Sequence, residues 1–82
     1  MNFVVPAGSV LEHTMSLAQA IARNAPLSVA ASKRMINEGA GLAEDDAWIL
    51  NEAAFHRIKD TADALEGPQA FAEKRQPTWQ GR

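Results

Sequence analysis

The sequence predicts an all-α protein of four or five helices behind a short extended lead-in at the amino terminus. Apolar residues recur at three- and four-residue intervals over most of the 82 residues, which is the spacing of one helix face. Prolines and glycines fall between these periodic segments, where helices start and stop. A strand pattern occurs only at Phe3-Val4-Val5. These observations predict a chain without a β-sheet.

The first helix is predicted to begin near Val10 and to end near Asn24. Ser9 and Glu12 have the spacing of a capping box, in which each side chain satisfies a backbone N–H at the start of a helix. Pro26 forbids further regular helical bonding, which sets the expected end.

A second helix is predicted from Pro26 to about Glu38. Proline is tolerated at the first helical position because its missing N–H would have no partner there. Gly39 and Gly41 follow and are expected to end the helix. One face consists largely of small residues, which favours close approach to another helix.

The third and longest helix is expected over residues 43–59. Three acidic residues crowd its first turn and two basic residues its last, which complements the helix dipole; these are Glu44, Asp45, Asp46, Arg57 and Lys59. The expected buried stripe is Ala47, Leu50, Ala54, Phe55 and Ile58. Trp48 falls on an adjoining face and is expected to pack against another segment or another subunit.

Two short helices are predicted near the end of the chain. Asp60 or Thr61 caps a helix through Leu65, and Gly67 supplies a left-handed exit. A final short helix is expected over 68–75, opened by a proline.

Composition predicts one domain with a thin core. Hydrophobic residues make up 46% of the chain, but many are alanines, which bury little area each. A chain of this length buries only roughly 60–65% of the surface that its unfolded form exposes. We therefore expect helices that need a partner surface to complete their burial.

Charge and cysteine content exclude several classes of protein. The net charge of -2, with scattered basic residues, does not favour nucleic acid as a partner. The absence of cysteine excludes disulfides and thiolate metal sites, and makes the cytoplasm the default location. The amino-terminal apolar piece is too short for a membrane-spanning helix and lacks the basic region of a signal peptide. We expect no membrane partner.

The most specific motif covers residues 63–81 and reads D-x-x-E-G-x-x-A-F-x-E-K-R-x-P-x-W-x-G. It resembles the carboxyl-terminal signature of the enoyl-CoA hydratase/isomerase (crotonase) family. Further matches in the family's order are Val5-Pro6, Leu17-Ala18, Ile21-Ala22, Pro26, Lys33 and Glu52. The resemblance thus extends over nearly the whole chain.

The resemblance implies a relation to acyl-CoA chemistry in fatty acid metabolism, without catalytic groups in this chain. Members bind acyl-CoA thioesters in a spiral core, where two backbone N–H groups stabilise the enolate and carboxylates move protons. That core precedes the matched region, so no catalytic residue is assigned here. Acyl-CoA would be the substrate of the parent protein, and no cofactor is expected.

In relatives the matched region packs helices across subunits of trimers or hexamers and helps to close the CoA site. The resemblance therefore implies that Phe71 lies against the nucleotide end of CoA and that Lys74 approaches its phosphates. The residues alone favour Phe71 as a core anchor and Lys74 as a solvated charge; with the motif, the core and ligand roles of Phe71 are about equally supported. Arg75 fits either a ligand contact or an intramolecular salt bridge.

The remaining polar residues favour structural roles. Asp63 and Glu66 are expected to fix the turn at Gly67. His13 and His56 have no cysteine companions, so no metal site is predicted. Trp48 and Trp79 suit an interface, a core position or a loop that covers a site.

The leading interpretation is that residues 1–82 form a single carboxyl-terminal helical domain of an enoyl-CoA hydratase/isomerase-like protein, with the catalytic core absent. The parent reaction would be hydration of a 2-enoyl-CoA or a related double-bond shift. The alternative is a free-standing helical oligomerisation module without CoA chemistry. On the leading interpretation the partners are other copies of the chain or the missing core, and the chain alone is not expected to catalyse.

Overall fold

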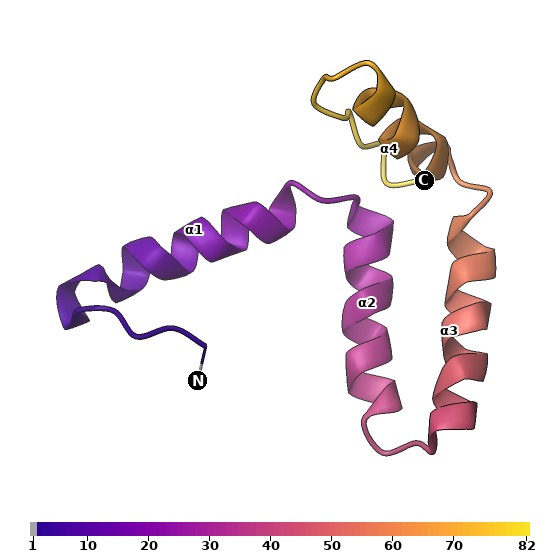
Figure 1. The fold of residues 1–82 in the computed structure, drawn as a ribbon, viewed down its shortest axis with the longest axis horizontal. Coiled ribbons are helices and arrows are strands. Elements are labelled where there is room, and N and C mark those ends of the chain that lie inside the picture. The colour runs from indigo at the N-terminus through magenta and orange to yellow at the C-terminus, as the bar shows by residue number, and fades with distance from the viewer. Residues whose placement is uncertain (1) are drawn as a thin grey trace.

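A computed structural model describes residues 2–82, which form four α-helices and no strand. A short 3₁₀ turn, η1, precedes them. The elements are η1 Ala7–Ser9, α1 Val10–Ala22, α2 Pro26–Gly39, α3 Glu44–Ile58 and α4 Ala62–Ala72 (Figure 1). The predicted all-α class is confirmed.

The helix α1 begins at Val10 as predicted, but the predicted capping box is wrong. The Ser9 side chain makes no capping hydrogen bond, because Ser9 belongs to the 3₁₀ turn, in which its N–H donates to the Pro6 carbonyl at 2.9 Å. At the other end, the Asn24 side-chain amide donates to the Ala20 carbonyl at 2.8 Å. The last turn of α1 is therefore closed by a side chain just before the bend into α2.

Helices α2 and α3 lie side by side as an antiparallel hairpin, whereas α1 extends away from it (Figure 1). Pro26 occupies the first turn of α2, and the acidic residues fill the first turn of α3, both as predicted. The predicted buried stripe of α3 is only partly correct. Ala54 is buried at 8% exposure, but Phe55 is 59% exposed because it borders the open groove between α2 and α3.

Helix α4 runs without a break through Gly67 and Pro68, so the prediction of two short helices is wrong. Thr61 caps it, its Oγ1 accepting from the Ala64 N–H at 3.2 Å. Gly67 is not left-handed, since Gly81 is the glycine with positive φ among residues 2–82. The helix ends at Ala72, three residues before the predicted end, because the chain turns back at residues 73–75 to cover α4.

The chain is open rather than compact. Its radius of gyration is 16.0 Å, against about 12 Å for a compact domain of this length. Its accessible surface is 6728 Å², against about 4,800 Å² expected for a folded monomer of this mass. In residues 2–82 the buried apolar side chains are Ala54 and Ala70. The core within the chain is therefore thin, as its composition predicted.

Large apolar side chains are exposed on all four helices. They include Leu11 and Ile21 on α1, Ile36 on α2, Trp48 and Ile49 on α3, and Leu65 and Phe71 on α4. None of the helices in residues 2–82 has the length and hydropathy needed to cross a bilayer. The exposed apolar faces thus belong to short amphipathic helices.

Candidate functional site

The carboxyl end of α4 closes in a turn that places Lys74 in a left-handed conformation, with φ of 54°. The Lys74 N–H donates to the Phe71 carbonyl at 3.1 Å, and the Arg75 N–H donates to the Ala70 carbonyl at 3.0 Å. This pair of bonds is the Schellman motif, in which the left-handed residue is usually glycine. A lysine therefore occupies a backbone position that disfavours any side chain.

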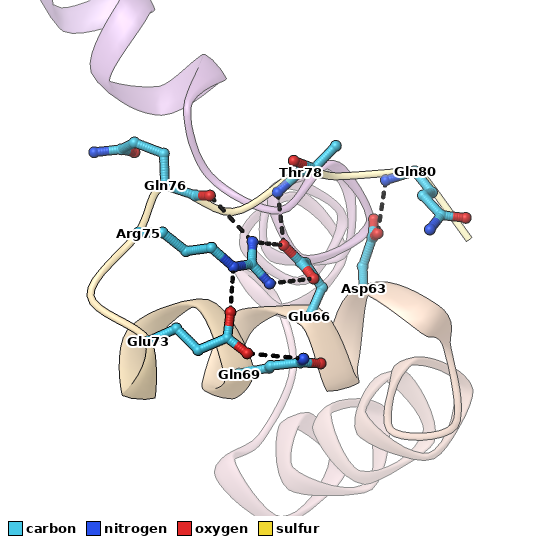
Figure 2. Close-up of polar contacts among 8 residues, drawn as sticks. All are labelled: Asp63, Glu66, Gln69, Glu73, Arg75, Gln76, Thr78 and Gln80. Atoms are coloured by element: carbon cyan, nitrogen blue, oxygen red, sulfur yellow. Dashed lines mark hydrogen bonds and ion pairs between the residues drawn. The ribbon is translucent and has the colours of Figure 1, made fainter.

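Arg75 joins two carboxylates beside this turn (Figure 2). Its Nη1 and Nη2 donate to the two carboxylate oxygens of Glu66 at 2.6 and 3.2 Å, and its Nε donates to Glu73 at 2.6 Å. Glu66 also accepts from the Thr78 N–H at 2.8 Å, and Glu73 accepts from Gln69 at 3.0 Å. The intramolecular salt bridge that the sequence left open for Arg75 is thus present.

These contacts shift the pKa values of all three groups. Hydrogen bonds from Arg75 and from the Thr78 N–H lower the pKa of Glu66 from 4.5 to about 2. The Arg75 and Gln69 side chains likewise lower the pKa of Glu73. The two carboxylates raise the pKa of Arg75. At neutral pH all three groups are therefore charged, and each charged form is favoured by its partners.

Asp63 holds the last residues of the tail against the start of α4. Its carboxylate accepts from the Gln80 N–H at 2.7 Å and from the Gly81 N–H at 2.8 Å, and its own N–H donates to the Arg82 carbonyl at 3.0 Å. The residue is only 4% exposed. Asp63 and Glu66 therefore bind the returning tail, and the prediction that they fix a turn at Gly67 is wrong.

Trp79 connects the tail to the bend between α1 and α2. Its Nε1–H donates to the Arg23 carbonyl at 2.8 Å, and its ring lies against Gly67. The sequence left an interface, a core position and a covering loop open for Trp79; within residues 2–82 its ring is half-buried and fastens the tail to α4 and to the bend before α2. Trp48 is 58% exposed on α3, where it borders a small pocket together with Met35 of α2.

The structure brings the two predicted ligand residues to one turn. Phe71 is 86% exposed, so it is not a core anchor within this chain. Lys74 is also exposed and follows Phe71 by three residues, joined to it by the backbone bond of the turn. An exposed aromatic residue and an exposed lysine thus lie within one turn of the chain.

Two histidines and a groove lie elsewhere in residues 2–82. No group of three or more His, Cys, Asp and Glu side chains in the described part of the chain is placed to hold a metal ion. His13 lies against Phe3, with ring centroids 5.1 Å apart, and His56 approaches Glu52 at 3.8 Å on the surface of α3. A groove of about 550 Å³ between α2 and α3 is lined by apolar and neutral polar side chains, including Met35, Phe55 and Asn51.

Sequence reasoning missed the assembly that orders the turn at Lys74. Arg75 was expected to make either a ligand contact or an intramolecular salt bridge, and the structure shows it joined to both Glu66 and Glu73. Gly67 was interpreted as the end of a helix, but α4 continues through it. The spacing of the two glutamates in the sequence could have indicated this assembly. Glu66 and Glu73 are seven residues apart, two helical turns, so a guanidinium returning over the helix can reach both.

Known proteins match this chain over its whole length. The family model described as Enoyl-CoA hydratase/isomerase matches residues 1–82. The chain therefore belongs to the enoyl-CoA hydratase/isomerase family, as the resemblance of residues 63–81 predicted.

Relatives include carnitinyl-CoA dehydratase of Proteus mirabilis (strain HI4320), which is 40% identical over 85 residues, spanning 99% of this chain and 33% of that protein. Enoyl-CoA hydratase EchA19 of Mycobacterium tuberculosis is 42% identical over 82 residues, spanning 100% of this chain and 31% of that protein. The chain thus spans about a third of the length of the curated relatives that it matches.

Solved structures share the arrangement of the helices. The crystal structure of enoyl-CoA hydratase from Bacillus anthracis superposes with a TM-score of 0.95 at 34% identity, covering 100% of this chain and 32% of that one. Enoyl-CoA hydratase EchA1 from Mycobacterium marinum gives a TM-score of 0.90 at 39% identity, covering 100% of this chain and 34% of that one. The open helical arrangement is therefore that of one part of larger proteins of this family.

Proposed function

We propose that this chain is the carboxyl-terminal helical domain of an enoyl-CoA hydratase/isomerase-like protein, in which it serves subunit assembly and closes the acyl-CoA site. The observation that carries the proposal is the match of the family over the full chain, combined with a span of only a third of the relatives. The parent reaction would be hydration or isomerisation of a 2-enoyl-CoA. Residues 1–82 alone are proposed to be inactive, because no catalytic group is assigned in them.

The ligand-closing role is supported by the edge at Phe71 and Lys74. A phenyl face that is 86% exposed can cover an adenine ring, and an ammonium group binds phosphate as a point charge. The turn that carries Lys74 is held by two backbone bonds. Acyl-CoA would then meet an ordered surface, so little conformational entropy would be lost on binding.

Isothermal titration of the purified chain with CoA tests this role. We expect heat of binding from the native chain, and affinity roughly tenfold weaker for Lys74→Ala, the order expected from loss of one charge-assisted contact. Lys59→Ala is the matched control, since Lys59 is also an exposed lysine just beyond the end of a helix. Phe71→Ala should weaken binding as well. Absence of heat at millimolar CoA would reject the role for this chain.

The assembly role is supported by the exposed apolar faces of α1, α2 and α3. The accessible surface exceeds that of a compact chain of this mass by roughly 1,900 Å², and such faces are stabilised when another surface covers them. The same observation favours the second candidate, a free-standing oligomerisation module. Both candidates place the partner on these faces, and the partner is another copy of the chain or the proposed missing core.

Sedimentation velocity tests assembly independently of CoA. We expect association that rises with concentration, and weaker association for Trp48→Ala, because Trp48 is one of the large exposed side chains. A helical chain that stays monomeric up to millimolar concentration would contradict self-assembly. Assembly without CoA binding would favour the oligomerisation module.

A further inference from the structure

Lys74 lies between two charged residues in the chain and forms no ion pair with Glu66 or Glu73. Glu73 precedes it and Arg75 follows it. Among residues 2–82 the ion pairs of this turn are Arg75 with Glu66 and Arg75 with Glu73, and Lys74 takes part in neither. The turn therefore carries two cations, of which Arg75 takes both carboxylates.

Every carboxylate oxygen of the two glutamates already has a donor (Figure 2). Arg75 donates to both oxygens of Glu66 and to one of Glu73, the Thr78 N–H donates to Glu66, and Gln69 donates to the other oxygen of Glu73. Arginine suits this task because its planar fork reaches two carboxylates at once, which a lysine ammonium group does less well. No strong acceptor of these two groups is left without a partner.

The backbone gives an independent indication that a side chain is needed at position 74. A left-handed residue at this place in a Schellman motif is usually glycine, and a side chain there costs roughly 1–2 kcal/mol. Lys74 nevertheless holds φ of 54°. Strain of this kind occurs where the surrounding structure enforces it, often beside ligands.

We propose that Arg75 is a positioning residue that keeps Lys74 available for an anionic ligand, by binding Glu66 and Glu73 and by holding the turn that carries Lys74 beside Phe71. The inference rests on the proposed function, in which the anion is a phosphate at the nucleotide end of an acyl-CoA. Without Arg75, Glu66 and Glu73 would change from partners of Arg75 into competitors of the ligand for Lys74. Glu66, Glu73 and Lys74 would then carry a net negative charge, which repels phosphate.

A comparison of the native chain, Arg75→Gln and a triple variant distinguishes this role from simple stabilisation of the turn. In titrations with CoA we expect Arg75→Gln to weaken binding roughly fivefold, the upper range for exposed charges. The triple variant Glu66→Gln, Glu73→Gln, Arg75→Gln should recover most of that loss, because the competing carboxylates are gone although no ion pair remains. A triple variant that binds no better than Arg75→Gln would overturn the proposal and leave Arg75 as a stabilising residue only.

A second measurement does not depend on CoA. The chain holds three lysines, Lys33, Lys59 and Lys74, so acetylation with a limiting amine reagent can be followed at Lys74 against the other two by mass spectrometry. We expect Lys74 labelling to fall in Arg75→Gln, because a paired amine is less accessible, and to return in the triple variant. Unchanged labelling in Arg75→Gln would overturn the proposal. If Lys74 labelling falls in Arg75→Gln and returns in the triple variant, but the native chain does not bind CoA, Arg75 keeps Lys74 unpaired and the proposed ligand is rejected.

Discussion

The indole ring of Trp79 lies directly against Gly67 in the middle of α4. A Cβ added at Gly67 would be 3.4 Å from Cη2 of Trp79 and 3.8 Å from Cζ3. The same indole donates through Nε1 to the Arg23 carbonyl at 2.8 Å. One side chain of the tail thus joins α4 to the bend between α1 and α2, which lies 56 residues away in sequence.

Gly67→Ala should stabilise the chain by about 0.5–1 kcal/mol, because Gly67 is helical and alanine is the better helix former. The added methyl would meet Trp79 at an ordinary contact distance. Chemical denaturation followed by circular dichroism measures the change. Gly81→Ala is the matched control: Gly81 has φ of 74°, so the same substitution should cost roughly 1 kcal/mol there. Destabilisation by Gly67→Ala would mean that the ring of Trp79 tolerates no side chain at this position.

Lys74→Gly should stabilise the end of α4 by roughly 1 kcal/mol, because it removes the side chain from a left-handed residue. The proposed function adds a second expectation, that the same change weakens CoA binding. Denaturation and titration of one variant therefore test both. Lys74→Ala keeps the strain and removes only the charge, so it should show the loss of binding without the gain in stability. Equal stability of the two variants would argue against backbone strain at this residue.

The attachment of the tail to α4 should weaken in acid. Because the pKa of Glu66 in the folded chain, about 2, lies below its usual 4.5, its contribution is fully present above about pH 4.5. The contribution is then lost as the pH falls towards 2. Glu73, whose pKa is also lowered, acts in the same direction.

Fluorescence of Trp79 in a Trp48→Phe background reports the position of the tail during such a titration. We expect a change of emission below pH 4.5 in this background. Glu66→Gln should flatten it, since glutamine has no proton to gain in this range. A titration unaffected by Glu66→Gln would show that another group governs the acid response.

Helix positions were largely predictable because they depend on local signals. The starts of α1 and α2 follow from apolar spacing and from Pro26, whose ring suits a first turn and disrupts a helix interior. The capping box at Ser9 was wrong because η1 supplies a different partner for the same backbone. The break at Gly67 was wrong for a similar reason: the tail, folded back through Trp79, stabilises one continuous helix.

The hydrogen bonds and ion pairs around the candidate site were not predictable from the sequence. Phe71 and Lys74 were identified through the family resemblance, and the structure places them at one turn. The exposure of Phe71 could not be predicted from the sequence, because the pattern of a short helix does not say which of its faces another segment covers. The link from Arg75 to Glu66 spans nine residues and depends on how the tail returns over α4.

By itself, the sequence determined the helical class, most helix limits and membership of the enoyl-CoA hydratase/isomerase family, because periodicity, proline positions and an ordered motif are properties of the chain alone. Only the tertiary structure decided that Asp63, Glu66 and Trp79 bind the returning tail, and that Arg75 takes both carboxylates beside Lys74. These contacts join residues distant in sequence. Their partners are fixed by the direction in which the chain turns after α4, which no local pattern encodes.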